Sequence, residues 1–122
     1  MEPERIGAIR AELEGSFGPQ AIVYKATADG RHLFKIERVP LPPGCNPPAT
    51  EALLVYPPGS DTPEIYARQG IVLPNGAAPK NTYPTVIEGE AWMKWSAQWS
   101  WNSSESITVN LMRKIWRFRW GE

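Results

Sequence analysis

The spacing of hydrophobic residues predicts a helix near the start of the chain, over residues 3–14. Ile6, Ile9 and Leu13 recur at intervals of three and four, which places them on one face of a helix. Gly15 follows directly and is expected to end the helix, because glycine is common just after a helical C-terminus. The stretch therefore predicts an amphipathic helix with one face available for packing.

A second helix is predicted near the end of the chain. Ile107, Leu111 and Ile115 recur at every fourth position, so a helix would bring them onto one stripe. Ser103 or Ser104 precedes this stripe and is expected to cap the helix, because a serine hydroxyl accepts a hydrogen bond from the N–H groups of the first turn.

Between the helices, runs of apolar and β-branched residues predict strands. They cover residues 21–27, 32–38, 52–56 and 64–73. Asp29 and Gly30 separate the first two runs, and this pair tolerates the positive φ of a tight hairpin. A proline-rich connector over residues 40–48 precedes the third run, and Pro74 ends the fourth. An antiparallel meander is the simplest arrangement of these strands.

The segment between the last of these strands and the second helix has no regular pattern. Residues 75–84 have the composition of a loop, and residues 90–101 are rich in aromatic side chains without an assigned structure. The predicted fold class is α+β: an N-terminal helix, an antiparallel β-meander, a long irregular segment and a C-terminal helix. A length of 122 residues suits a single domain over residues 1–122.

The charge balance argues against nucleic acid and membrane partners. Thirteen Lys+Arg and thirteen Asp+Glu give a formal net charge of zero, so the chain lacks the basic excess of a nucleic-acid or anionic-membrane binder. The N-terminal stretch is acidic and lacks the apolar run of a secretion signal. We therefore expect a cytoplasmic protein.

Only one cysteine and one histidine occur, Cys45 and His32. This count excludes an intrachain disulfide and a Cys/His metal cluster, and the chain has no glycine-rich phosphate loop. We therefore expect no cofactor and no metal site. Cys45 is expected to be structural, because no basic group near it in sequence would activate its thiol. A Cys45–His32 dyad is the alternative.

The order of the predicted elements resembles the ubiquitin-conjugating-enzyme (UBC) fold. In that superfamily a Tyr-Pro turn follows the third strand, and a further strand ends in a His-Pro-Asn motif. The matching positions here are Tyr56, Pro57, Pro63, Ile65, Ile71, Pro74 and Asn75. Trp101, six residues before Ile107, matches the tryptophan that precedes the next helix. The proline-bracketed segment around residues 41–59 is similar to a bacterial branch, prokaryotic family E.

This resemblance implies a function in ubiquitin-like protein conjugation. The chain would receive or position a ubiquitin-like protein whose C-terminus has been activated by a ThiF-like adenylating enzyme. The resemblance also has clear departures. Leu73 takes the place of the motif histidine, and counting back from the tryptophans puts Met93 or Ala91 at the position of the catalytic cysteine. The family's usual nucleophile is therefore missing.

Ser96 and Asn75 are the candidate catalytic residues. Ser96 is the serine closest to the expected nucleophile position, and its hydroxyl could accept the acyl group as an oxyester if an acyl-adenylate were the donor. The resemblance assigns to Asn75 either stabilisation of the oxyanion in acyl transfer or a structural role in its loop. As residue types, Ser96 also suits an ordinary loop position, and Asn75 before Gly76 suits a turn.

The candidate binding residues are aromatic: Tyr56, Trp95, Trp99 and Trp101. Trp92, Trp95 and Trp99 fall at i, i+3 and i+7, so they could form a flat binding surface or close the core of a small domain. Near the chain end, four basic residues are expected to form a solvated helix face: Arg113, Lys114, Arg117 and Arg119. A docking surface for an acidic partner is the alternative for these four.

Three functional hypotheses follow from the sequence. The first is a transferase with a noncysteine nucleophile. The second is a catalytically inactive UBC-fold scaffold that positions the ubiquitin-like protein or its activating enzyme, and the missing cysteine and histidine both favour it. The third is an unrelated tryptophan-rich interaction domain.

Overall fold

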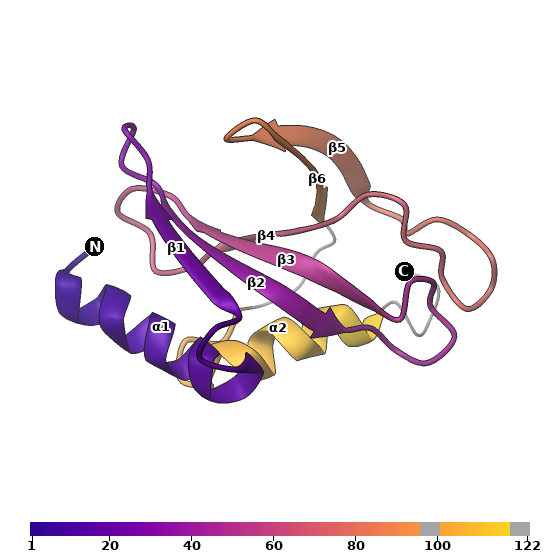
Figure 1. The fold of residues 1–122 in the computed structure, drawn as a ribbon, viewed down its shortest axis with the longest axis horizontal. Helices are drawn as coiled ribbons and strands as arrows, with labels where there is room; N and C mark the ends of the chain where they lie inside the picture. Colours follow the sequence, from indigo (N-terminus) through magenta and orange to yellow (C-terminus); the bar gives the residue numbers. More distant parts are fainter. Residues whose placement is uncertain (96–100, 118–122) are drawn as a thin grey trace.

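Two helices cover one face of a twisted antiparallel sheet (Figure 1). The computed structural model describes residues 1–95 and 101–117. Within these residues the sheet has six strands in the order β1-β2-β3-β4-β6-β5. The elements are α1 (Pro3–Phe17), β1 (Ile22–Ala26), β2 (His32–Pro40), β3 (Ala49–Tyr56), β4 (Glu64–Ala67), β5 (Thr82–Ile87), β6 (Glu90–Trp95) and α2 (Ile107–Ile115). The predicted α+β class is confirmed. No helix among the described residues is both long and apolar enough to span a membrane.

Helix α1 begins as predicted but continues past Gly15 to Phe17. The helix ends at Gly18, which has φ +108° and whose N–H donates to the carbonyl of Glu14 at 2.9 Å. A glycine inside a helix costs only about 1 kcal/mol relative to alanine, so the packing of Ile9 and Leu13 outweighs the weak stop at Gly15. The strained backbone position at residue 18 is where glycine is required.

The first hairpin is confirmed. β1 and β2 pair in register from Ile22↔Ile36 to Ala26↔His32, and only Gly30 of the turn has positive φ, at +88°. β2 pairs with β3, and β3 with β4, in the predicted antiparallel order. The four strands of the meander are therefore correctly ordered.

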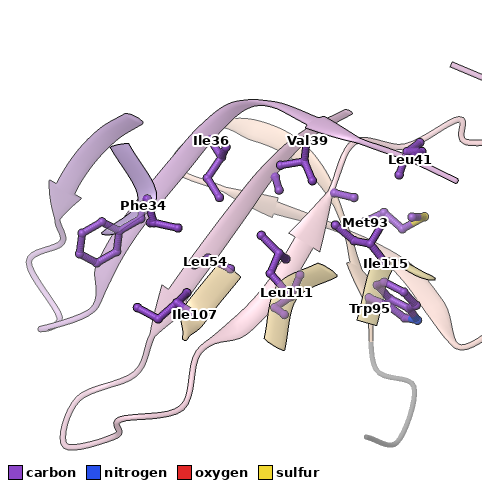
Figure 2. Packing of buried hydrophobic residues seen from close by; sticks show 14 of the residues in the cluster. Phe34, Ile36, Val39, Leu41, Leu54, Met93, Trp95, Ile107, Leu111 and Ile115 are labelled. Atoms are coloured by element: carbon purple, nitrogen blue, oxygen red, sulfur yellow. The ribbon is translucent and has the colours of Figure 1, made fainter. Parts of the chain in front are cut away.

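One face of the sheet and the two helices enclose the main core (Figure 2). Alternate residues of the central strands point into it, including Phe34 and Ile36 of β2 and Leu54 of β3. The helices supply Ile9, Leu13, Ile107, Leu111 and Ile115. Burying such side chains contributes about 1.5–3 kcal/mol each, so the predicted helical stripes hold the helices to the sheet.

Strand β4 is shorter than predicted. It ends at Ala67, because Gly70 turns the chain at φ +92° before Ile71. The rest of the apolar run is still buried at Ile71 and Leu73. Val72 forms an isolated antiparallel bridge with Asn46 through N–H···O bonds of 2.8 and 2.9 Å.

The prediction of a long irregular segment is wrong over residues 82–95, which form the hairpin β5–β6. Glu88 and Gly89 make its two-residue turn with φ of +50° and +79°. Two successive positive φ values characterise the tight turns that match strand twist. Among the described residues, the pairs Tyr66↔Lys94 and Ala67↔Met93 join β6 to β4, and the rest of the hairpin curls over the sheet face opposite the helices (Figure 1).

Helix α2 starts later than either predicted cap. It begins at Ile107, and Ser106 is its N-cap, with a side-chain oxygen that accepts from the Val109 N–H at 3.0 Å. The Glu12 carboxylate of α1 also accepts from the Ile107 N–H, at 3.0 and 3.1 Å. This contact fixes the start of α2 against α1, a long-range effect that local sequence does not reveal.

Candidate functional site

Asn75 lies in an exposed turn just after the buried Leu73. Its side-chain oxygen accepts from the Ala77 N–H at 3.0 Å. The Leu73 N–H donates to the Ala77 carbonyl at 2.8 Å, and the Gly76 N–H donates to the Leu73 carbonyl at 2.9 Å. The Asn75 oxygen thus closes the turn, as the structural role requires. An oxyanion would be bound by the side-chain NH2 group, so the oxyanion role stays a prediction. At the position of the motif histidine, Leu73 belongs to the core.

Ser96 and Trp99 lie outside the described residues. Ser96 follows Trp95, the last residue of β6, directly in sequence. Of the neighbouring serines, Ser103 and Ser104 are exposed and precede α2 by more than one residue, and the Ser104 hydroxyl donates to the side chain of Asn102 at 2.6 Å. The role of Ser96 as acyl acceptor therefore stays a prediction.

The other aromatic candidates pack in or against the core. Tyr56 is fully buried, with its ring edge-on to Phe34 at a centroid distance of 5.8 Å. Trp95 is 3% exposed, and Trp101 is partly buried against the same cluster. These positions favour the packing interpretation over a flat binding surface. The Tyr56 hydroxyl has no hydrogen-bond partner among the described residues, and burial raises the pKa of Tyr56.

Cys45 is buried in the main core beside the Asn46–Val72 bridge. Burial raises the pKa of the Cys45 thiol, which lowers the fraction of reactive thiolate at neutral pH. Among residues 1–95 and 101–117, no group of three or more His, Cys, Asp or Glu side chains is placed to hold a metal ion. The geometry of Cys45 is that of a packing residue.

Two buried polar residues of α2 were not identified as such from the sequence. The first is Asn110, which is fully buried. Its side-chain oxygen accepts from the Asn102 N–H at 2.8 Å. Its side-chain nitrogen donates to the carbonyls of Asn102 and Ser106 at 2.8 and 2.9 Å. Asn110 therefore fastens the preceding loop to α2.

The second is Lys114, which contradicts the prediction of a solvated basic face at this position. Lys114 is 2% exposed, and its Nζ donates to the Trp95 carbonyl at 3.0 Å and lies 5.1 Å from the centre of the Trp95 ring. Burial lowers the pKa of Lys114 from 10.5 to about 7, and the positive charges of Arg117 and Lys94 add to the shift. The physical reason is the helical stripe, because Lys114 lies seven residues after Ile107 on the face that meets the sheet.

The sheet face opposite the helices carries a second apolar cluster, which we call the outer cluster. It consists of Leu33, Leu53, Val55, Tyr66, Ile87 and Trp92. The β5–β6 hairpin supplies the last two of these residues, so the hairpin covers part of this face. The outer cluster explains why the hairpin lies against the sheet despite its short contact with β4.

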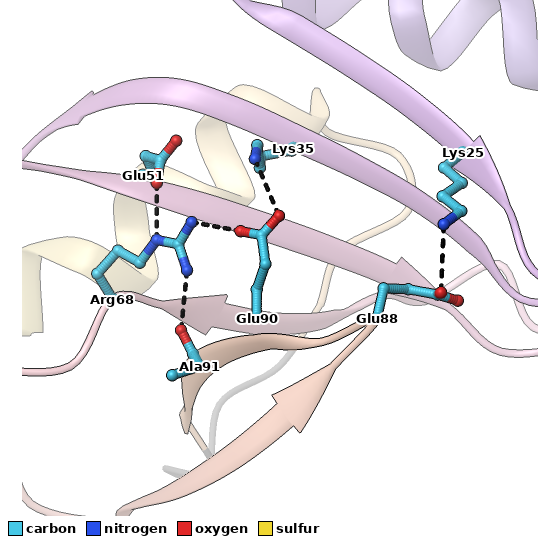
Figure 3. Close-up of polar contacts among 7 residues, drawn as sticks. All are labelled: Lys25, Lys35, Glu51, Arg68, Glu88, Glu90 and Ala91. Carbon is cyan, nitrogen blue, oxygen red and sulfur yellow. Dashed lines mark hydrogen bonds and ion pairs between the residues drawn. The ribbon is translucent and has the colours of Figure 1, made fainter.

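An ionic network surrounds the outer cluster (Figure 3). Arg68 donates to Glu51 at 2.7 Å, to Glu90 at 2.5 Å and to the Ala91 carbonyl at 2.9 Å. The Arg68 guanidinium also lies 3.9 Å from the centre of the Trp92 ring. The hydrogen bond from Arg68 lowers the pKa of Glu90, and the charge of Lys35 adds to this shift. Arg68 thus ties β3 to β6 while its guanidinium covers the Trp92 ring.

The structure brings the predicted site residues together only in part. Tyr56, Trp95 and Trp101 meet in and around the main core, whereas Asn75 lies in an exposed turn outside that cluster. A scan against family models finds no matching family, and no curated protein and no solved structure matches the chain.

Proposed function

We propose that this chain is a ubiquitin-conjugating-like protein that positions a ubiquitin-like protein delivered by a ThiF-like adenylating enzyme, and that it forms no thioester. The observation that carries the proposal is the order of elements: α1, the antiparallel strands β1 to β4 and then α2 on the same sheet face as α1. The resemblance to the ubiquitin-conjugating fold predicts this order, except that the β5–β6 hairpin stands between β4 and α2, where an irregular segment was expected. Pro63 stands directly before β4, and Pro74 follows the buried Leu73.

The state of Cys45 supports a positioning role. A thioester carrier needs an accessible thiol with a lowered pKa, and Cys45 is 7% exposed with a raised pKa. The hypothesis of a tryptophan-rich binding surface loses support from the burial of Trp92 and Trp95.

An oxyester on Ser96 is the other form of the proposal, in which the chain is a transferase. A serine hydroxyl has a high pKa and needs a base or a very good leaving group to react as a nucleophile. An acyl-adenylate supplies such a leaving group. The two forms differ in whether a covalent adduct appears.

We expect no covalent adduct when the chain is incubated with the adenylating enzyme, ATP and the ubiquitin-like protein. Gel electrophoresis with and without thiol, and with hydroxylamine, measures this outcome. Cys45→Ser and Ser96→Ala serve as matched variants, and both should behave like the unchanged chain.

Two outcomes would contradict the scaffold form. A thiol-resistant, hydroxylamine-sensitive adduct that disappears in Ser96→Ala would make the chain a serine-dependent transferase. A thiol-sensitive adduct that disappears in Cys45→Ser would overturn the assignment of Cys45 as a packing residue.

A further inference from the structure

Two adjoining pockets lie on the outer face of strands β1 and β2. The first has a volume of about 140 Å³ and an apolar lining of Val23, Leu33, Leu53, Ile87 and Trp92. Its rim carries two ion pairs that connect the hairpin turn to the strands, Lys25–Glu88 at 3.2 Å and Lys35–Glu90 at 3.4 Å (Figure 3). The β5–β6 hairpin therefore forms one wall of this pocket.

The size of the first pocket limits what it can hold. Pockets for cofactors and drug-sized molecules occupy about 300–1,000 Å³, whereas an apolar cavity of about 150 Å³ accommodates a single benzene ring. A pocket of about 140 Å³ therefore fits one leucine-sized or phenyl-sized group. The apolar lining favours an uncharged hydrocarbon group over a polar one.

The second pocket has a volume of about 200 Å³ and is more polar, with Gln20, Glu37 and Glu51 among its lining residues. Glu51 is paired with Arg68, and Lys35, which also lines this pocket, is paired with Glu90. Glu37 makes no ion pair with any residue of the described ranges. The negative charge of the Glu37 carboxylate is therefore complementary to one cationic side chain of a ligand.

The two pockets follow one another along β1, and their spacing matches that of alternate residues on an extended chain. They share Val23 and Lys35. Val23 and Lys25 of β1, and Ala21 just before it, border the pockets and alternate with Ile22 and Tyr24, which face the main core. Alternate residues on a strand lie about 7 Å apart, and an extended peptide presents its own side chains with the same period. β1 is also a terminal strand of the sheet.

We propose that this outer face binds an extended peptide segment of a partner protein. An apolar side chain of the peptide enters the pocket beside Trp92, and a basic side chain two positions away lies next to Glu37. The contact is separate from any acyl-transfer chemistry, so its failure would leave the proposed conjugation role unaffected.

The hairpin wall of the first pocket is already in place without a peptide. Ile87 and Trp92 are buried and hold the hairpin against the sheet. Val23 lines the same pocket and is 57% exposed, so the apolar lining reaches solvent. A leucine-sized group can therefore enter without opening the hairpin.

The test is an NMR titration of the full chain with a short threonine-rich peptide that carries one leucine and an arginine two positions further on. We expect saturable shifts of the amide signals of Val23, Leu33 and Trp92. Val23→Asp should weaken the affinity at least tenfold, because it places a charge between the pockets. Val109→Asp is the matched control, since Val109 is a similarly exposed valine on α2, and it should leave the affinity unchanged.

A charge reversal tests the second pocket independently. A peptide with glutamate in place of arginine should bind the unchanged chain at least fivefold more weakly, and Glu37→Lys should reverse this preference. No saturation at millimolar peptide would overturn the proposal. Equal effects of Val23→Asp and Val109→Asp, or indifference to the charge reversal, would also overturn it.

Discussion

Replacement of Lys114 by methionine is expected to raise the free energy of unfolding at pH 6 by about 2–4 kcal/mol. Lys114 is 2% exposed, and burial lowers its pKa to about 7. At pH 6 the folded chain must therefore hold a buried ammonium group. Each unit of pKa shift corresponds to about 1.4 kcal/mol, and methionine fills a similar volume without a charge. The substitution also removes the donor to the Trp95 carbonyl, which offsets about 1–3 kcal/mol of the gain.

The sign of the pH dependence follows from the direction of the shift. Between pH 7 and about 10 the unfolded chain still binds the proton at Lys114 and the folded chain does not, so the stability of the unchanged protein rises with pH. Below pH 7 the full penalty of the charged group remains. The advantage of Lys114→Met should therefore shrink as the pH rises from 6 to 10.

Urea unfolding followed by circular dichroism at several pH values measures this difference. Groups other than Lys114 titrate alike in both proteins, so their contributions cancel. Lys80→Met is the matched control, because Lys80 is exposed and its loss should change stability by less than about 0.5 kcal/mol at every pH. A gap between Lys114→Met and the unchanged chain that is the same at pH 6 and pH 9 would contradict the account.

The second large effect is expected for Asn110→Ala, which should lower the free energy of unfolding by about 3 kcal/mol. The substitution removes three hydrogen bonds and leaves the N–H and carbonyl of Asn102 without the Asn110 side chain, whereas the Ser106 carbonyl keeps the backbone N–H of Asn110 at 3.1 Å. Each hydrogen bond contributes about 0.5–1.5 kcal/mol net, so the loss of three accounts for a destabilisation of about 3 kcal/mol. A loss of this size should lower the melting temperature by about 10 °C.

Asn75→Ala is the matched control for this experiment. Asn75 is exposed and its side chain makes one hydrogen bond, to the Ala77 N–H, so its loss should cost no more than about 1 kcal/mol. Thermal unfolding of both variants gives the comparison. Equal destabilisation by the two substitutions would show that the buried network of Asn110 is not what holds the loop to α2.

The meander and the two helices could be predicted because their signals are local. Ile6, Ile9 and Leu13 have the period of a helix, and Gly30 has the backbone freedom that the first hairpin needs. The β5–β6 hairpin had a comparable signal in Glu88-Gly89, but a non-glycine residue at positive φ is uncommon and the turn was not recognised. The surrounding aromatic residues then concealed the alternation of the strands.

The buried polar groups were harder to predict. Asn110 and Lys114 lie three and seven residues after Ile107, on the same stripe as Leu111 and Ile115, so the helical period does place them inward. The residue type of Lys114 nevertheless predicts an exposed position, because lysine is almost never fully buried. Only the tertiary structure supplies the Trp95 carbonyl that accepts from Lys114.

The candidate site was predicted from a resemblance. Some of its features depend on residues that are neighbours in sequence, and others depend on contacts between distant strands. The turn role of Asn75 follows from a short Asn-Gly sequence, and the structure has the side-chain bond that this role requires. The burial of Cys45 and Tyr56 depends on contacts between distant strands and could not be read from their neighbours in sequence. The pocket beside Trp92 requires three separate strands and the hairpin, so no local pattern indicates it.

We propose that the chain positions a ubiquitin-like protein for its adenylating enzyme by noncovalent binding. Isothermal titration calorimetry of the unchanged chain against each of these two proteins tests it most directly. We expect saturable binding to at least one of them with a dissociation constant in the micromolar range, and the same constant for Cys45→Ser. The account would be contradicted by no measurable binding to either protein at concentrations of several hundred micromolar.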